Sequence, residues 1–224
     1  MNKLSIAVLS ISIFFAACED PAANKTKATT TNSATTTAPA DVSAANSANS
    51  QPGKMAAKGT AFKIYPDNSQ VEFVGSKVTG KHDGGFKTFT GTIDLVNNKP
   101  EESKVSVDIE TNSIYADDDK LTGHLKSADF FEVEKYPKAT FVSTKITPDT
   151  AKGAGNYTVT GDFNLHGATK SITFPAKITV SDSDALVESE FSINRKDFGL
   201  VYAGKADDLI RDDVVIKLNL KAVK

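Results

Sequence analysis

The feature that most constrains this chain is a two-residue alternation of apolar and polar side chains, which recurs from Phe62 to the C-terminus. Successive side chains of a β-strand point to opposite faces, so a segment with this period forms a strand with one buried face. The alternation predicts eight strands, over residues 71–76, 86–96, 105–110, 139–144, 157–165, 172–180, 187–193 and 214–221. The fold is therefore all-β, either a sandwich or an up-and-down barrel.

The connections between the strands favour an antiparallel arrangement. Short polar turns such as Asn97-Asn98 and 153–155 join neighbouring segments. Residues 116–128 break the alternation and predict one short helical segment, whose acidic start suits a helix N-terminus. Pro175 lies inside an apolar strand, which indicates a sheet edge or a bulge.

The first residues have the pattern of an export signal. A positive start is followed by the apolar run 4–15, the small pair Ala16-Ala17, and Cys18, the single cysteine of the chain. The run is too short to span a bilayer of about 30 Å as a helix. Residues 1–17 resemble a lipoprotein signal peptide, which implies cleavage before Cys18 and lipidation of Cys18. We therefore expect an exported protein, held on a membrane of the bacterial cell envelope, on the periplasmic side or the cell surface.

A low-complexity stretch separates this signal from the strands. Residues 18–58 are rich in Ala, Thr, Ser and Asn, and Val42 and Met55 are their only sizeable apolar side chains after the cysteine. Such a composition does not bury enough apolar surface to offset the entropy of ordering. We predict a disordered tether over 18–58 and one folded domain over 59–224.

Charge and motifs exclude several function classes. The formal net charge of −2 gives no basis for a nucleic-acid partner. The sequence contains no nucleophile elbow, Walker loop or dinucleotide-binding motif, and its three histidines are far apart without metal-ligand spacing. The run Asp117-Asp118-Asp119 lacks the spacing of a calcium loop and is interpreted as a solvated helix cap. We therefore predict no metal, no cofactor and no catalytic residues.

Four segments together resemble a known family. Residues 124–143 (HLKSADFFEVEKYPKATFVS), 157–174, 191–199 and 212–222 are similar in order and spacing to the YceI-like, polyisoprenoid-binding domains. The resemblance covers essentially all of residues 59–224. It implies an extended, eight-stranded antiparallel, lipocalin-like β-barrel that holds a long isoprenoid or a similar amphiphile in its lumen, without catalysis.

The resemblance and the strand phase together nominate site residues. Nine phenylalanines are candidates for the lining of the lumen: Phe73, Phe86, Phe89, Phe130, Phe131, Phe141, Phe163, Phe191 and Phe198. His124 is expected to brace the helical segment, with a position at the rim beside a ligand head group as the alternative. Arg195 and Asp197 are expected to pair near the barrel rim, with contact of Arg195 to a ligand head group as the alternative. The segment 78–85 is polar and glycine-rich, unlike the apolar mouth of many family members.

Pattern alone leaves three functions open. The first is a membrane-tethered binding protein for a polyisoprenoid or related lipid. The second is an enzyme that acts on an apolar substrate inside the barrel. The third is an interaction module whose barrel is filled by its own side chains, since phenylalanine in a strand is more often core than pocket wall. A homodimer is also possible.

Overall fold

The computed structural model describes residues 19–33 and 59–224, and the fold below is that of these residues. The signal segment, Cys18 and residues 34–58 of the predicted tether lie outside them. The strands are β1 (Thr29–Asn32), β2 (Thr60–Ile64), β3 (Gln70–Lys77), β4 (Gly80–Phe86), β5 (Phe89–Val96), β6 (Lys99–Glu110), β7 (Ile114–Ala116), β8 (Lys138–Pro148), β9 (Asn156–Leu165), β10 (Ala168–Val180), β11 (Asp184–Asn194), β12 (Gly204–Lys205), β13 (Asp208–Leu209) and β14 (Asp213–Val223).

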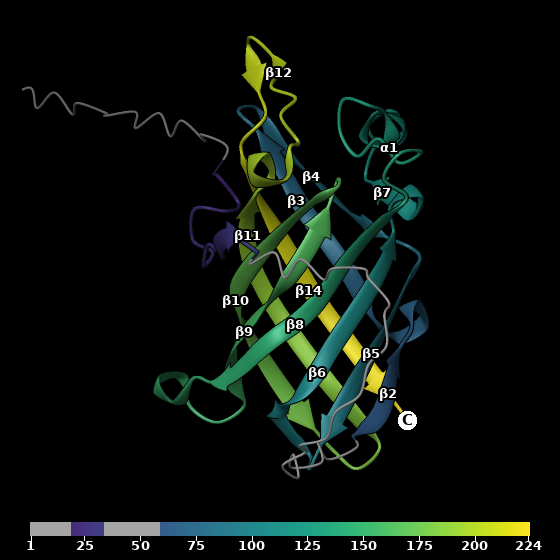
Figure 1. Ribbon diagram of the computed structural model, residues 1–224. Coiled ribbons are helices and arrows are strands. Elements are labelled where there is room, and N and C mark those ends of the chain that lie inside the picture. Colours follow the sequence, from purple (N-terminus) through teal and green to yellow (C-terminus); the bar gives the residue numbers. More distant parts are fainter. Residues whose placement is uncertain (1–18, 34–58) are drawn as a thin grey trace, which may run out of the picture.

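Eight long antiparallel strands close into a barrel (Figure 1). Each of the first three is interrupted and carries two labels: β2 and β3 form the first, β4 and β5 the second, and β6 and β7 the third. The other five are β8, β9, β10, β11 and β14. Each long strand pairs with the next one along the chain. The last strand, β14, also pairs with β2 and β3, which closes the barrel. The predicted eight-stranded antiparallel barrel is confirmed.

The turns follow from local residue chemistry. Asn97 and Asn98 form the two-residue turn between β5 and β6, with φ of 54° and 55°. His166 and Gly167 form the same kind of turn between β9 and β10, with φ of 52° and 76°. Two consecutive residues with positive φ match the right-handed twist of the flanking strands, and Asn and Gly tolerate this conformation. The predicted turn at Asn97-Asn98 is therefore confirmed.

The helix lies over one end of the barrel (Figure 1). It is α1 (Asp119–Lys126), and the carboxylate of Asp118 accepts a hydrogen bond from the Leu121 amide at 2.7 Å. This contact confirms that the acidic run caps a helix. Among the described residues, no helix is long and apolar enough to cross a membrane.

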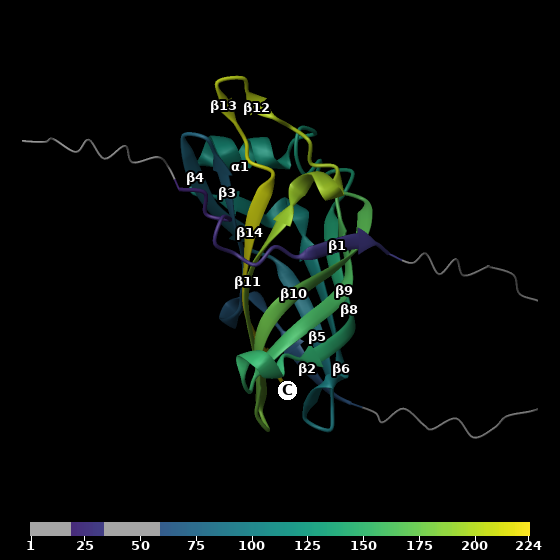
Figure 2. The ribbon, with the colours of Figure 1, turned by 90° about the vertical axis from the view of Figure 1, so that its left-hand side faces the viewer.

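The predicted disorder of residues 18–58 is wrong for residues 19–33. β1 pairs with β10 over four residues, and Ala22 and Ala28 are buried (Figure 2). Composition was a poor guide here because a strand added to a sheet is held mainly by backbone hydrogen bonds, which need no large apolar side chain.

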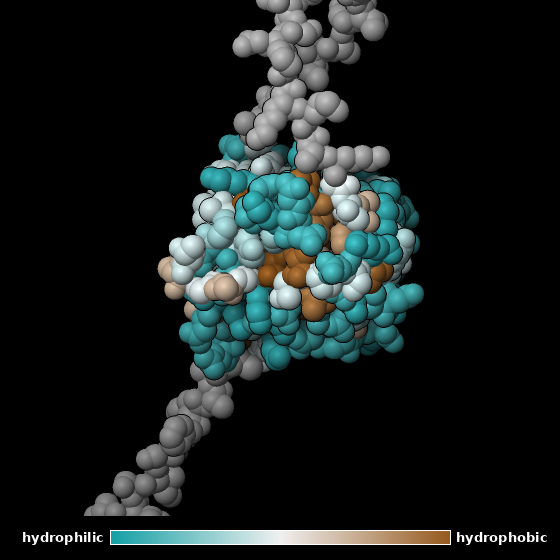
Figure 3. Space-filling view, turned by 90° about the horizontal axis from the view of Figure 1, so that it is seen from below, coloured by the Kyte–Doolittle hydropathy of each residue, from teal (hydrophilic) through white to brown (hydrophobic). Residues whose placement is uncertain are grey.

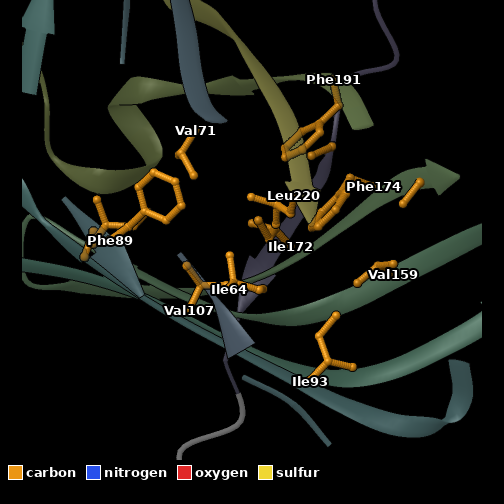
Figure 4. Close-up of a cluster of buried hydrophobic side chains, with 14 of the residues drawn as sticks. Ile64, Val71, Phe89, Ile93, Val107, Val159, Ile172, Phe174, Phe191 and Leu220 are labelled. Atoms are coloured by element: carbon orange, nitrogen blue, oxygen red, sulfur yellow. The ribbon is translucent and has the colours of Figure 1, made fainter. Parts of the chain in front are cut away.

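The apolar core fills one end of the barrel and thins toward the other. Phe62 and Ile64 of β2 are completely buried, and Leu95 of β5 is 3% exposed. Viewed from the end near the C-terminus, apolar residues occupy the centre, inside a ring of hydrophilic ones (Figure 3). The close-up of the cluster shows side chains of several strands pointing inward toward one another (Figure 4).

Candidate functional site: an apolar cavity in the barrel

A cavity of about 440 Å³ occupies the barrel interior. All eight wall strands contribute side chains to it, and α1 and the β12–β13 hairpin contribute to its upper end. Small-molecule sites in proteins measure roughly 300–1,000 Å³ and are mostly apolar. The cavity therefore has the size and the lining of a ligand site.

Strand β14 shows that this space is open. Its inward side chains Val214, Ile216 and Leu218 line the cavity and are only partly buried, although they point into the barrel. Deeper along the same face, Leu220 is 5% exposed. Apolar side chains inside a closed wall retain accessible surface only where no neighbour covers them. The barrel is therefore open along Val214, Ile216 and Leu218 and becomes more tightly packed toward Leu220.

Seven of the nine nominated phenylalanines lie at the cavity: Phe73, Phe86, Phe130, Phe131, Phe141, Phe163 and Phe191. The other two assignments are wrong. Phe89 is 2% exposed and Phe198 is completely buried, and neither borders the cavity. Phe198 packs edge-on against Phe163, with ring centroids 5.2 Å apart, so it contacts a lining residue without bordering the cavity itself.

Two glycines let aromatic rings approach the wall closely. A Cβ atom on Gly161 would lie 2.4 Å from Cζ of Phe141, and one on Gly84 would lie 2.5 Å from Cζ of Phe73. Gly84 and its neighbour Gly85 belong to β4, so the polar segment 78–85 that marked the expected entrance is largely a wall strand. Its glycines permit a close approach of side chain to backbone.

Polar groups gather at the upper end of the cavity. Lys77 of β3 pairs with Asp208 of β13, with Nζ 2.7 Å from Oδ2. His82 of β4 contacts Asp117, with Nδ1 2.8 Å from Oδ1. These four residues tie the hairpin and the start of the helical segment to the β3–β4 wall, and three of them (Lys77, His82 and Asp208) line the cavity. The cavity is thus an apolar tube with a polar rim.

His124 braces the helix, as the sequence predicts. Its Nε2 atom lies 2.8 Å from Oδ2 of Asp129, and its ring packs edge-on against Phe130 and Tyr202, with centroids 5.0 Å away in both cases. Phe130 and Tyr202 also contact each other at 5.2 Å. All three rings line the cavity, so this aromatic group forms part of its cover.

The expected pair of Arg195 with Asp197 is wrong. Arg195 is 4% exposed and donates to the carbonyl oxygens of Leu200, of Arg211 at 3.1 Å and of Ile210 at 3.4 Å. Its ion-pair partner is Asp212 at 3.3 Å. Burial lowers the pKa of Arg195 from its ordinary value, which the charge of Asp212 opposes.

This geometry also disfavours the head-group role of Arg195. Each nitrogen of the guanidinium already donates to an oxygen of the protein, so the side chain ties the end of β11 to the segment before β14. Asp197 is exposed on the outside of the short helical turn Arg195–Phe198. The pairing with Asp197 was predicted because Asp197 is close to Arg195 in sequence. Asp212 lies 17 residues from Arg195, and only the closed barrel brings the two together.

Among the described residues, no group of three or more His, Cys, Asp or Glu side chains could hold a metal ion. Three ionisable side chains at the rim, Lys77, His82 and His124, are each paired with an acid. The site therefore offers an apolar binding surface with a polar rim at its upper end.

Comparison with known proteins agrees with this architecture. The model of the YceI-like domain family matches residues 62–222, which is most of the chain. The chain belongs to the YceI-like family. It is 36% identical over 140 residues to the UPF0312 protein of Pseudomonas putida strain W619, a match that covers 60% of this chain and 71% of that protein. It is 37% identical over 123 residues to Protein YceI of Escherichia coli strain UMN026, covering 52% of this chain and 62% of that protein.

Two solved structures extend the comparison. BcnA of Burkholderia cenocepacia superposes on this YceI-like chain with a TM-score of 0.64 and 26% identity, covering 71% of this chain and 99% of BcnA. A polyisoprenoid binding domain from Saccharophagus degradans, implicated in plant cell wall breakdown, superposes with a TM-score of 0.59 and 21% identity, covering 74% of this chain and 99% of that domain. The second likeness shows the shared fold.

Several lining residues of the YceI-like barrel were missed by sequence reasoning. Phe174 lies at the cavity and was not nominated, although it shares the inward phase of Ile172 in the predicted strand 172–180. The alternation in this predicted strand could therefore have identified Phe174 as a lining residue. Tyr202 and the β12–β13 hairpin were also missed, and no periodic pattern in this short segment could have placed them over the cavity.

Proposed function

We propose that this chain binds a long apolar or amphiphilic molecule, a polyisoprenoid or a related lipid, inside its barrel. The observation that carries the proposal is the cavity inside the barrel, toward which Val214, Ile216 and Leu218 point and in which they stay partly uncovered. A bound hydrocarbon chain would cover these surfaces at roughly 25 cal/mol per Å² of apolar area, so a long tail binds without a charged partner. The polyisoprenoid-binding function of the Saccharophagus degradans domain supports the same ligand class.

The polarity of the cavity suggests how the ligand lies. Its lower part is entirely apolar, whereas Lys77, His82 and Lys205 line the upper end. An amphiphile therefore inserts its tail downward and leaves its head group at the rim. This orientation places the head group beside α1 and the β12–β13 hairpin.

The finer part of the proposal concerns the cell envelope. The signal-like residues 1–17 and Cys18 support export and lipid anchoring, and they precede the barrel in the chain. We infer a carrier or store of lipid that stays tethered to a membrane. Binding without catalysis is proposed because Lys77, His82 and His124 at the rim are engaged in structural ion pairs.

Native mass spectrometry of the protein purified from membranes tests the proposal. We expect a copurified lipid whose mass is lost on denaturation. Leu218→Trp fills the cavity and should abolish copurification, whereas Asn219→Trp, on the exposed face of the same strand, should retain the lipid. A wild-type barrel that carries no lipid and is not stabilised by added isoprenoids would contradict the proposal and favour an interaction module. Conversion of the bound molecule during incubation would favour an enzyme.

A further inference from the structure

The wall of the barrel has a seam between β10 and β11. These strands pair only over Lys177–Val180 with 185–188, which is four residues of each strand. On their other sides, β10 pairs with β9 over ten residues and β11 pairs with β14 over eleven. Pro175 lies where β10 and β11 part, and it has no amide hydrogen to donate to a neighbour. The edge or bulge expected at Pro175 is thus the start of a seam.

The N-terminal segment fills this seam. The Ala28 amide donates to the Ser192 carbonyl at 2.8 Å, and the Ser192 amide donates to the Thr26 carbonyl at 3.0 Å. Directly afterwards, β1 pairs antiparallel with residues 170–173 of β10 (Figure 2). We call residues 26–33 the strap. The strap is a short wall strand between β10 and β11, and it satisfies backbone groups that would otherwise form two open edges.

The seam leads to the cavity. Ile172 and Phe174 of β10 and Phe191 and Ile193 of β11 flank the seam, and all four line the cavity. Ala28 of the strap is 6% exposed and belongs to the same buried cluster as these residues. The strap is therefore the outer wall of the binding space at this level.

The strap is held weakly compared with the strands beside it. Its side chains are small or polar, and β1 forms only four ladder pairs. Lys27 pairs with Asp213 at 2.6 Å, and Lys25, just before the strap, pairs with Glu190 at 2.8 Å. Both ion pairs are solvent-exposed, and exposed pairs contribute little to stability. Segments with few buried apolar contacts open locally without unfolding of the whole domain.

We propose that the strap is a movable section of the barrel wall and that its release opens a lateral entrance to the cavity between β10 and β11. This inference rests on the proposed binding function. The upper end of the cavity is covered by the ring group of His124, Phe130 and Tyr202. A long apolar chain that enters sideways along the seam does not have to thread past these rings end-on.

A reversible lock on the strap tests this proposal. Thr31 and Ser171 are paired residues of β1 and β10, and cysteines at adjacent antiparallel positions lie within disulfide distance. The lock is Thr31→Cys with Ser171→Cys in the full chain carrying Cys18→Ser, so that the new cysteines are the only ones. The matched control is Asn164→Cys with Thr169→Cys, a pair across β9 and β10 that does not involve the strap.

The measurement is the rate of binding and release of a fluorescent farnesol derivative by stopped flow. We expect the oxidised lock to slow association and dissociation by about tenfold or more, and reduction to restore both rates. Lys25→Ala with Lys27→Ala should speed both rates. Lys177→Ala, which removes an exposed β10–β11 pair below the seam, should not.

The outcomes separate the two proposals. Unchanged rates in a locked protein that still binds the probe would overturn the lateral entrance and leave the binding function intact. Absence of binding in both oxidised and reduced forms would overturn the binding function and the entrance together. Hydrogen exchange supplies a readout without ligand, in which the amides of residues 28–32 should exchange much faster than those of residues 177–180. Equal protection of the two segments would show that the strap is a fixed part of the wall.

Discussion

Phe174 of β10 and Phe191 of β11 stack face to face across the seam, with ring centroids 4.3 Å apart and an angle of 11° between the planes (Figure 4). Their strands have already parted at this level, so the contact bridges the two sides of the seam from inside. Aromatic pairs contribute about 0.5–1.5 kcal/mol beyond the area that they bury. The seam is thus closed by the strap outside and by two apolar rings within.

The first prediction separates lumen residues from packed core. Phe62→Ala should destabilise the empty barrel by about 3–5 kcal/mol, because Phe62 is completely buried and does not border the cavity. Phe141→Ala should cost roughly half as much or less, because its ring already faces open space. Bound ligand stabilises only a folded state that can hold it. The increase in stability on adding ligand should therefore fall more in Phe141→Ala than in Phe62→Ala.

Denaturant titrations with and without a long isoprenoid measure both quantities on wild type and the two variants. Phe163→Ala, also at the cavity, should behave like Phe141→Ala. Equal losses in the presence and absence of the isoprenoid, for both cavity variants, would mean that these rings act only as core.

The second prediction concerns Arg195. Its truncation to Ala leaves buried carbonyl oxygens without donors, so we expect a loss of about 2–4 kcal/mol in the free energy of unfolding. Arg195→Lys should recover only part of this, because an ammonium group lacks the planar fork of donors. Asp197→Ala is the matched control and should change stability little, since its side chain is exposed. A selective loss of ligand affinity with unchanged stability would instead indicate a head-group contact.

The third prediction is a pH dependence at the rim. The hydrogen bond from Lys77 lowers the pKa of Asp208 below its ordinary value of 3.8, and Thr79 adds two further hydrogen bonds. A carboxyl group whose pKa is lower in the folded state than in the unfolded state stabilises the fold at pH values above its unfolded-state pKa. This stabilisation is lost as the pH falls through its folded-state pKa. The β12–β13 hairpin should therefore loosen only in acid, below pH 3.8.

An NMR titration of the carboxyl resonances gives the titration midpoint of Asp208 directly. Hydrogen exchange of the Val78 amide, which donates to the carbonyl oxygen of Leu209 at 3.1 Å, reports the opening of the hairpin. Lys77→Ala should return the Asp208 midpoint toward its ordinary value. Lys81→Ala, on an exposed side chain that pairs with Asp83, should leave it unchanged. An unshifted midpoint in wild type would contradict the prediction.

The fourth prediction tests the anchor. Cys18 follows the small pair Ala16-Ala17, which supports cleavage before it and acylation of its side chain. Several acyl chains, at about 0.8 kcal/mol per buried CH₂, would hold the mature protein on a membrane. Cys18→Ser should leave unprocessed precursor or release soluble protein, as measured by membrane fractionation and intact mass. Normal processing and membrane association of this variant would rule out the lipid anchor.

Much of the barrel could be read from local pattern. Each predicted strand from 71–76 to 214–221 overlaps a strand of the barrel, because inward and outward positions alternate along most of each segment. The same phase placed most of the nominated phenylalanines at the cavity. It failed for Phe89, since an inward side chain can face either open space or packed neighbours, and both cases have the same period. Phe198 lies in the short helical turn Arg195–Phe198, outside the predicted strands, so strand phase did not place it.

The sequence by itself therefore determined the all-β class, the positions of the strands along the chain, the acidic cap of the helix and the family resemblance, all of which depend on residues close together in the chain. Only the tertiary structure decided that the barrel encloses a cavity, that Arg195 pairs with Asp212, and that residues 26–33 complete the wall. These features depend on contacts between distant segments, such as Lys27 with Asp213, which are 186 residues apart. Closure of the barrel brings such segments together, and no short-range pattern records which of them meet.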